Sequence, residues 1–277
     1  MARTAAKSSF LVSDKLWSRI DVLIPKRKNT HRFGGGRPRR PDRDCMNGIL
    51  FVLRTGCQWR ALDVTGICPG STAHDRFQEW ERAGVFRQFW RTGLLEYDEL
   101  KGIDWKWLSA DGAMSKAPLA GKKTGPNPTD RAKCGTKRSL LTDGRGVGTG
   151  LAVGGANVND FKLLRETIQS IPVKRPKPTR QKPQNLCLDK GYDYREVRDL
   201  TRAYHFTPHI RSRGEEAKLL KRGRGFKARR WVCERTHSWM NRFRRILIRW
   251  EKKDENYSAM IHLSLGIIAL RAAGLFG

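Results

Sequence analysis

The sequence has few acidic residues for its length. Its 277 residues include 27 Asp and Glu against 56 Lys and Arg, which gives a formal net charge of +29. An excess of this size is more than an ordinary solvated surface carries, and it predicts a polyanionic partner: DNA, RNA or an anionic membrane face. Because 38% of the residues are hydrophobic, the chain can still bury a core and is not a disordered basic tail.

The sequence also lacks a membrane-spanning run, a secretory signal and closely paired cysteines. The most apolar segment, AMIHLSLGIIALRAAGLF (259–276), is interrupted by His262 and Arg271. Its continuous part is shorter than the ~20 residues of a membrane span, so we expect a buried C-terminal helix and no membrane partner. The N-terminus lacks the apolar core of a secretory signal. The six cysteines form no CxxC pair, which argues against a zinc site or a disulfide framework and favours a reducing, cytoplasmic location.

The first hundred residues are predicted to be helical. Apolar residues recur at helical spacing in 13–25 and 42–56, and a further helix in 71–84 is expected to be capped by Ser71. Several short helices joined by tight turns predict a small, all-helical, helix-turn-helix-like DNA-binding domain over residues 1–100, with a generic helical bundle as the open alternative. Four residues of the third helix are expected to point outward, as on a groove-reading helix: Thr72, His74, Arg76 and Gln78.

Residues 101–277 predict a second domain, in which strands alternate with helices. Helices are expected at 159–171 and 194–204, and strands at 104–114, on either side of the DGRG turn within 135–155, at 185–189 and at 206–211. Three strands followed by alternating helices and strands form a mixed sheet with helices on its faces. This is the order of an RNase H-like α/β fold, although strand order alone would suit other α/β folds.

Two aspartates are expected to meet at the ends of neighbouring strands. In a sheet of this order the first and fourth strands lie side by side, with Asp111 at or near the end of the first and Asp189 at the end of the fourth. Carboxylate oxygens suit Mg²⁺ or Mn²⁺, and phosphoryl transfer on DNA commonly uses two such ions. Taken alone, an Asp beside a Gly is also typical of a simple turn.

A third acid is expected on the basic segment RRWVCERTHSWMNRFRRILIRWEK (229–252). At 100° per residue one stripe of this helix is apolar and should face the core: Val232, Trp239, Phe243, Ile246 and Trp250. Glu234 lies off that stripe in a polar column with His237, Ser238, Asn241, Arg242 and Arg245. An ordinary charged surface helix is the alternative.

The surrounding charge favours a site that binds phosphate. Residues 211–250 contain 14 Lys and Arg against three Glu, a density that repels itself unless phosphates neutralise it. Residues expected to contact DNA are Arg76 in the helical part and, near the third acid, Arg224, Arg229, Arg230, Arg235, His237, Asn241, Arg242 and Arg245.

Several stretches resemble the DDE transposases of bacterial insertion sequences, in the group named after insertion sequence five. SADGAMSKAP, CLDKGYD and VCERTHSWMNRFRR carry the resemblance over about residues 103–272, and SDKLWSRIDVLIP with GCQWRALD resembles that group's N-terminal helical domain. The resemblance implies an RNase H-like fold and a metal-bound triad at Asp111, Asp189 and Glu234. The related Tyr–Arg–Glu–Lys signature is met only in part, because Arg230 matches while Lys227 and Asn241 stand at the tyrosine and lysine positions.

The implied function is a transposase that depends on Mg²⁺ or Mn²⁺, with two ions. It would bind terminal inverted repeats, cut DNA at the element ends and join them to target DNA. A homodimer or larger assembly on DNA, in the bacterial cytoplasm at the nucleoid, is expected with it. Two alternatives stay open: a structure-specific RNase H-like nuclease without strand joining, and an inactive basic DNA-binding protein.

Overall fold

The computed structural model describes residues 10–26, 38–210 and 231–276. Its N-terminal part is helical, as expected, with α1 (Asp14–Asp21), α2 (Asp42–Thr55), the 3-10 turn η1 (Trp59–Leu62), α3 (Gly70–Arg82) and α4 (Val85–Lys101). Gly56 ends α2 in the left-handed conformation at φ 73°. The expected cap at Ser71 is wrong: α3 begins at Gly70, whose N–H donates to Asp63 Oδ1 at 2.7 Å.

The sheet has the predicted strands and one more. It contains β1 (Trp107–Lys116), β3 (Cys134–Thr142), β4 (Gly148–Gly155), β5 (Asn185–Leu188) and β6 (Thr207–Ile210), with the two-residue β2 (Gly125–Pro126) added. Strand β1 is antiparallel to β3 and parallel to β5, β5 is parallel to β6, and β4 is antiparallel to β3. The expected adjacency of the first and fourth strands is therefore confirmed. All of β5 is buried, as suits a strand covered on both faces.

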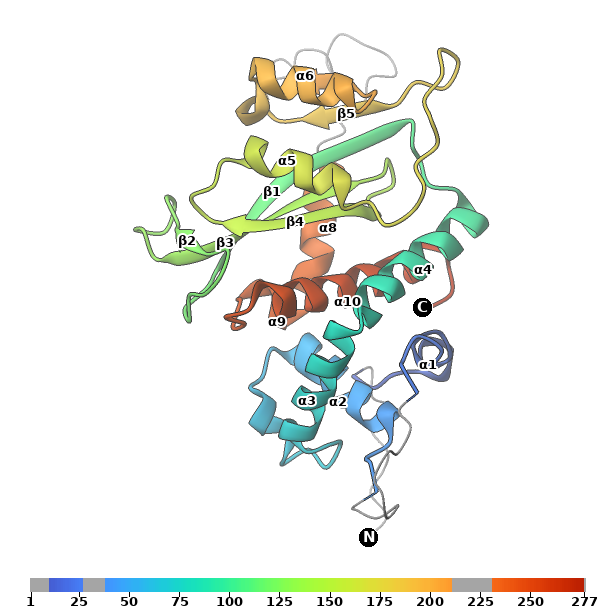
Figure 1. Ribbon diagram of the computed structural model, residues 1–277, viewed down its shortest axis with the longest axis vertical. Helices are drawn as coiled ribbons and strands as arrows, with labels where there is room; N and C mark the ends of the chain where they lie inside the picture. The colour runs from blue at the N-terminus through green and yellow to red at the C-terminus, as the bar shows by residue number, and fades with distance from the viewer. Residues whose placement is uncertain (1–9, 27–37, 211–230, 277) are drawn as a thin grey trace.

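Helices cover both faces of this sheet. On one face, α5 (Asp160–Gln169) and α6 (Arg195–Ala203) pack through a cluster that includes Leu108, Leu141 and Leu164. The other face carries α8 (Trp231–Asn241), the short α9 (Arg244–Leu247) and α10 (Asp254–Ala272). In Figure 1, α4 and α10 cross between the sheet and the helices α1–α3. The predicted mixed α/β architecture of RNase H-like order is confirmed.

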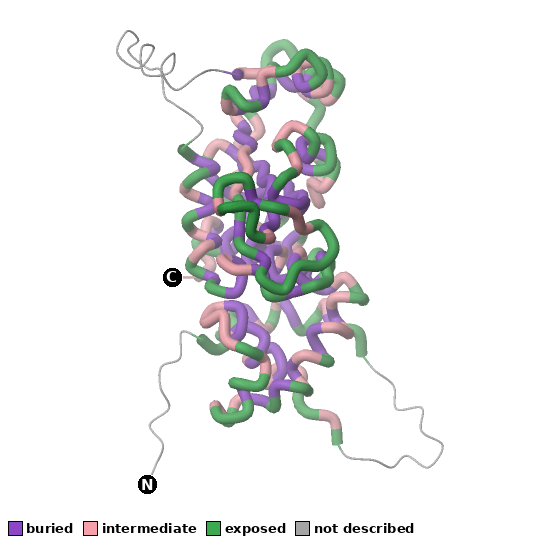
Figure 2. Tube along the Cα trace, turned by 90° about the vertical axis from the view of Figure 1, so that its left-hand side faces the viewer, coloured by how far each residue is buried: buried purple, intermediate pink, exposed green. Residues whose placement is uncertain are grey.

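The C-terminal helix α10 packs against the N-terminal helices of the chain. It packs against α4 so closely that a Cβ on Gly266 would lie 2.5 Å from the ring of Phe89. One apolar cluster accordingly includes side chains of α1–α4, of β3 and β4, and of α8–α10. Figure 2 shows buried residues along most of the length of the molecule, which include both this cluster and the one under α5 and α6. Within the described ranges, α10 included, no helix combines the length and the apolar character needed to cross a membrane.

Candidate active site

The first two acids lie where β5 ends beside β1. Strand β1 pairs with β5 only up to Ser109, which is opposite Cys187, so the same register continued by two residues brings Asp111 level with Asp189. Asp111 itself is not at a strand end, because β1 runs on to Lys116 against β3. That part of the expectation is wrong. Because β5 ends at Leu188, β1 has no β5 partner beside Asp111.

Asp189 leaves β5 and begins the 3-10 turn η2 (Lys190–Tyr192). The turn brings the chain back over the carboxylate: a Cβ on Gly191 would lie only 3.1 Å from Asp189 Oδ1. The glycine in the DKGYD stretch therefore allows the backbone to pass close to the acid, and a larger residue would crowd it.

Glu234 lies on α8, which packs against β1 and β3. Two buried contacts hold the helix to the sheet: Cys233 Sγ donates to the carbonyl of Leu140 at 3.5 Å, and Thr236 Oγ1 donates to that of Gly146 at 2.6 Å. The side chains of Asp111 and Leu140 point to the same face of the sheet, because these residues are directly opposite in the antiparallel pair. Helix α8 thus carries Glu234 to the face on which Asp111 points, and Glu234 is exposed there.

The carboxylates of this region repel one another. The pKa of Asp111 is raised from 3.8 to about 6, first by burial and then by the charges of Asp189, Asp160 and Glu234, against a backbone hydrogen bond from Gly112 that lowers it. Three acids from separate parts of the chain thus act on Asp111.

The donor set fits a hard divalent cation. Within the residues that the structure describes, no group of three or more His, Cys, Asp and Glu side chains is arranged to hold a metal ion. Mg²⁺, however, usually keeps several waters and takes only one or two protein carboxylates together with substrate phosphates. Asp111 and Asp189 offer oxygen ligands on two central strands, where β5 ends beside β1. Burial and neighbouring carboxylates both raise the pKa of Asp111, and a bound cation would favour its ionised form. Glu234 is close enough for its charge to raise the pKa of Asp111, although less than burial does.

Asp160 is a fourth acid that the sequence analysis did not single out. It is the first residue of α5, on the opposite face of the sheet from Glu234, and Lys137 Nζ donates to its Oδ2 at 3.1 Å. A Cβ on Gly112 would lie 1.9 Å from Asp160 Oδ1, so this glycine makes room for the carboxylate next to Asp111. The only sequence signal was an Asp at a helix start, which is typical of ordinary helix ends.

Three of the residues expected to contact DNA are buried, so their expected exposure is wrong. Arg76 is 9% exposed and bridges Asp42 and Glu79. His237 is 7% exposed, and burial, followed by the charge of Arg138, lowers its pKa to about 3. Arg245 is bound by Glu251 and by the Cys57 carbonyl.

The remaining expected contacts divide into three groups. Arg242 is exposed. Asn241 is half-buried and accepts a hydrogen bond from Arg138 Nη2 at 3.1 Å, and Arg235 lies between two tryptophan rings. Arg224, Arg229 and Arg230 lie outside the described residues, as does the first half of the basic segment 211–250.

The predicted apolar stripe of this segment is correct for Val232, Phe243 and Ile246, which are buried, whereas Trp239 is half-buried and Trp250 is exposed. Helix α8 ends at Asn241 and the chain turns at Phe243, which has φ −87° and ψ 91°, before the short α9 begins. The turn breaks the 100° periodicity, and Trp250 is 39% exposed instead of facing the core. On α3 the expected outward residues are also less free than predicted: Thr72, His74 and Gln78 are half-buried, and the His74 ring contacts Trp59.

Known proteins match both parts of the chain. The family described as putative transposase of IS4/5 family matches residues 12–90, and the transposase DDE domain matches residues 103–269. A putative transposase for insertion sequence element IS402 from Burkholderia cepacia is 39% identical over 149 residues, covering 53% of this chain and 68% of that protein. The uncharacterized 16.2 kDa protein of insertion element IS402, also from Burkholderia cepacia, is 33% identical over 119 residues, covering 43% and 81%.

Solved transposase structures are more distant. The catalytic domain of Mos1 mariner transposase is 12% identical and covers 69% of this chain and 93% of its own, at a TM-score of 0.29, which is too low to support an argument. The family assignment depends instead on the DDE domain, which spans more than half of the chain, and on the IS402 relative. This chain belongs to the DDE transposases of insertion sequences.

Proposed function

We propose that Asp111, Asp189 and Glu234 are the metal-binding acids of this transposase, and that it binds the terminal inverted repeats of its element, cuts DNA there and joins the ends to target DNA. The proposal is supported by the register that brings Asp111 level with Asp189 at the end of β5, and by the pKa of Asp111, which is raised to about 6 first by burial and then by the charges of Asp189, Asp160 and Glu234. Its substrate is the bacterial chromosome, so the protein would act in the cytoplasm at the nucleoid.

The acids have one task in this proposal, which is to hold divalent ions. Two bound Mg²⁺ or Mn²⁺ ions would supply Lewis-acid activation of the attacking oxygen and stabilisation of the leaving oxygen. Water is the nucleophile for cutting and a DNA 3′-hydroxyl for joining, so no covalent enzyme intermediate is required. Asp111 must be ionised to take part, and burial together with the neighbouring charges opposes its ionisation.

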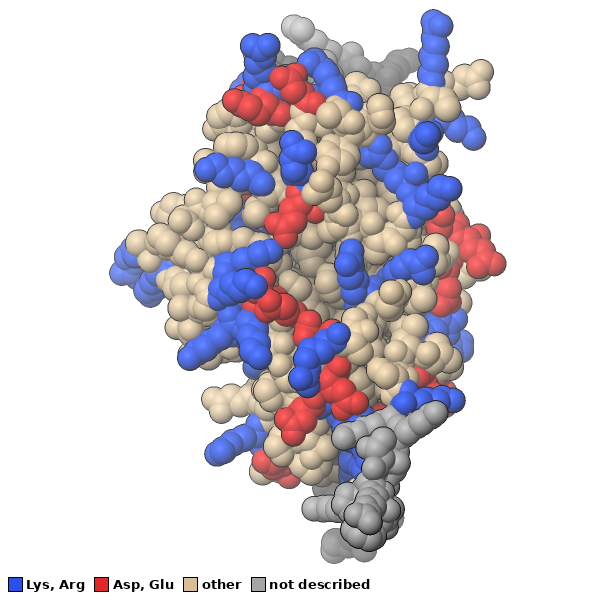
Figure 3. Space-filling model, viewed as in Figure 1, with Lys and Arg blue, Asp and Glu red and all other residues tan. Residues whose placement is uncertain are grey.

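We propose that DNA binds through Lys and Arg side chains distributed over the surface of the protein. Figure 3 shows Lys and Arg side chains scattered over one face of the molecule, from the sheet to the N-terminal helices, with Asp and Glu among them. Arg242, close to Glu234 in the chain, is the described basic residue that fits a phosphate contact near the acids. Strong loss of DNA affinity with rising salt is expected, because each phosphate neutralised releases counterions.

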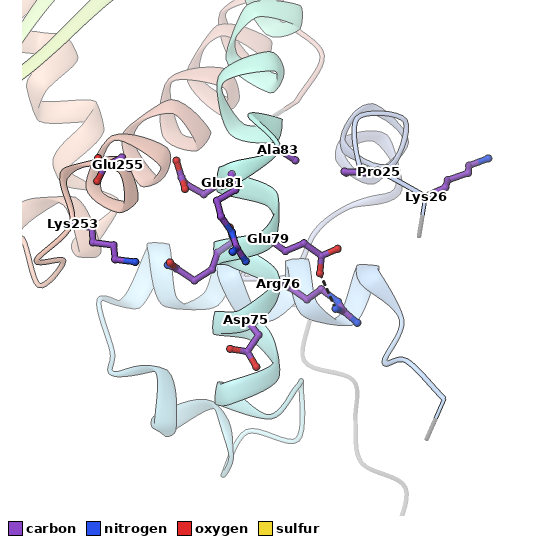
Figure 4. A pocket seen from close by; sticks show the side chains of 11 residues that line it. Pro25, Lys26, Asp75, Arg76, Glu79, Glu81, Ala83, Lys253 and Glu255 are labelled. Atoms are coloured by element: carbon purple, nitrogen blue, oxygen red, sulfur yellow. Dashed lines mark hydrogen bonds and ion pairs between the residues drawn. The ribbon is translucent and has the colours of Figure 1, made fainter. Parts of the chain in front are cut away.

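Recognition of the element ends is proposed for the helices within residues 1–100. A groove of about 1190 Å³ lies beside α3, between the end of α1 and the start of α10 (Figure 4). The described residues that line it do not form a phosphate channel, because the basic and acidic side chains among them are equal in number: Lys26, Arg76, Arg82 and Lys253 against Asp75, Glu79, Glu81 and Glu255. End recognition is better tested by single changes on exposed helix surfaces than by deleting residues 1–100, which would uncover the apolar side of α10.

An element has two ends, and both must be cut in one complex, so we propose at least a homodimer on DNA. The test of the function uses a plasmid that carries the gene with its flanking DNA, incubated with Mg²⁺ or Mn²⁺. Wild type should nick at the element ends and join them to a second DNA. Asp111→Asn and Asp189→Asn should each bind the plasmid and leave it uncut, since Asn keeps the shape but loses the charge.

The matched control is Asp193→Asn. Asp193 is close to Asp189 in the chain, but it pairs with Lys190 and Arg198 at the surface. Its loss should leave cutting unchanged. Cutting that survives in either site variant would remove that Asp from the proposal. Cutting by wild type without any joining would favour a nuclease, and no cutting at all would favour an inactive DNA-binding protein.

A further inference from the structure

A cavity of about 550 Å³ lies between residues 172–184, in the connection from α5 to β5, and residues 103–106, just before β1. Figure 1 shows this connection passing the start of β1 on its way to β5. Residues 172–184 contain five Lys and Arg and no acid. We call this space the linker cavity, and its volume is in the usual range for a small-molecule site.

The linker cavity is separate from the proposed metal site. It lies before the first residues of β1 and β5, where Trp107 is paired with Asn185. Asp111 and Asp189 follow four residues later on the same strands, which is ~13 Å further along the sheet. A ligand in the cavity would therefore not displace a metal ion from the acids.

Hydrogen bonds and prolines hold the walls of the cavity in place. Thr179 and Lys182 exchange backbone hydrogen bonds at 3.2 and 3.1 Å, which close a turn in the segment. Gln184 Nε2 donates to the carbonyl of Pro176 at 2.9 Å. Pro176 and Pro183, which both line the cavity, restrict the backbone further. Because the walls are already formed, a ligand loses less free energy to ordering them when it binds.

The cavity has an excess of positive charge. Lys106, Lys177 and Lys182 line it, and all three are exposed. In the described part of the chain, none of these lysines is paired with an acid. Asp104 is the only acid among the described lining residues, and its Oδ1 accepts the backbone N–H of Lys106 at 3.1 Å. Three lysines against one aspartate attract an anionic group such as a phosphate.

The rest of the wall suits a flat molecule that carries a hydrogen-bond donor. Ile103 and Trp105 are apolar lining residues, and Trp105 is half-buried, because it also packs against both apolar clusters. Gln184 is 4% exposed, and its Oε1 has no hydrogen-bond partner among the described residues. Its Nε2 already donates to Pro176, so this oxygen remains an acceptor. An N–H group of a ligand would remove the cost of leaving it unpaired.

We propose that the linker cavity binds a nucleotide, with the phosphate at the lysines and the base against Trp105 and Gln184. Guanine, adenine and cytosine carry an amino group that can donate to Gln184, and every base has a flat face. Inorganic phosphate would use only the lysines, and a nucleoside only the remaining wall. A free nucleotide and the end of a DNA strand share this chemistry, and the test separates them.

The test is titration calorimetry of the full chain without divalent ions, at physiological ionic strength. The probes are dGMP, deoxyguanosine, inorganic phosphate and a short single strand that begins with a 5′-phosphorylated deoxyguanosine. Binding of dGMP should be at least about ten-fold tighter than that of deoxyguanosine or phosphate, because dGMP alone uses both parts of the cavity. Equal affinity for the strand and for dGMP would support a strand end as the ligand, and weaker binding of the strand would support a free nucleotide.

Two variants test the two parts of the cavity separately. Lys177→Met combined with Lys182→Met should weaken binding of dGMP by about ten-fold and leave deoxyguanosine unchanged. Gln184→Leu should weaken both dGMP and deoxyguanosine and leave phosphate unchanged. The matched control is Lys174→Met, which removes an exposed lysine of the same segment that does not line the cavity. It should change no affinity.

Three results would overturn the proposal. Wild type could fail to bind dGMP at millimolar concentration. Phosphate could bind as tightly as dGMP, which would leave the base without a role. Lys174→Met could weaken dGMP as much as the paired lysine variant does, which would indicate a general attraction of anions to the basic segment. Asp111→Asn should bind dGMP as wild type does, so a protein that cuts no DNA but binds dGMP would refute the proposed function and keep this inference.

Discussion

Arg245 is the residue at which structure and sequence differ most sharply, and the difference can be measured. The sequence places it in a DNA-contacting column, whereas the structure buries it with Glu251. Arg245 Nε is 2.6 Å from Glu251 Oε1, and the two side chains are 7% and 5% exposed. Arg245 Nη1 also donates to the Cys57 carbonyl at 3.0 Å, which ties α9 to the end of α2. The pair therefore belongs to the packing of the molecule.

Removing the charge of Glu251 leaves a buried guanidinium without its counter-charge. Such changes cost about 3–5 kcal/mol, and Glu251→Gln should be near the lower figure because the amide can still accept one hydrogen bond. The midpoint of thermal unfolding should fall by roughly 6–10 °C. The double variant Arg245→Met/Glu251→Leu removes both charges, and its unfolding free energy should return to within about 1 kcal/mol of wild type.

The assay is urea unfolding of wild type, Glu251→Gln and the double variant, together with DNA affinity at low salt for the double variant. The matched control is Arg242→Met, which removes an exposed arginine three residues earlier. It should leave stability unchanged, weaken DNA binding and lower the salt slope by about one. If the double variant instead loses DNA affinity as Arg242→Met does, while Glu251→Gln unfolds like wild type, then Arg245 is a phosphate contact and the argument from burial is wrong.

Two further predictions concern the region around Asp111. Gly112→Ala should lower the free energy of unfolding, measured in urea, by about 1–3 kcal/mol, because the new Cβ would lie 1.9 Å from Asp160 Oδ1. Adding Asp160→Ser to this variant removes the clash and should recover most of the lost stability. The folded pKa of Asp111, about 6, exceeds its ordinary 3.8, so this group makes the protein less stable as pH rises from about 4 to about 6. In metal-free buffer at pH 8, Asp111→Asn should therefore be more stable than wild type, by up to about 3 kcal/mol. An unchanged or lower unfolding free energy would contradict the claim that burial and the neighbouring charges oppose the ionisation of Asp111.

The fold could be predicted because its signals are local. The continuous apolar run before Asp189 indicated a strand buried on both faces, and the DGRG turn between two strands indicated a hairpin. Strand order then placed β1 beside β5, and with them Asp111 beside Asp189. The two residues of β2 were missed because so short a strand has no periodicity to detect.

The residues around the acids were harder to predict, because their partners are distant in the sequence. Helical periodicity shows which residues share a face, but not which face the core covers, so Arg76 and His237 were placed outside when both are buried. The turn at Phe243 ended the periodicity on which the assignment of Arg245 depended. Asp160 was missed because only the sheet, through the open position at Gly112, brings it next to Asp111.

The central claim is that Glu234 completes the set of acids that cut DNA. It is tested most directly by cleavage of an element-end duplex with Mn²⁺, comparing wild type, Glu234→Gln and the control Glu255→Gln. Glu255 is an exposed acid at the start of α10 that pairs with Lys122. The account predicts that Glu234→Gln folds, binds the duplex with the affinity of wild type and leaves it uncut, while Glu255→Gln cuts normally. Normal cutting by Glu234→Gln would contradict the account and require another acid as the third metal ligand.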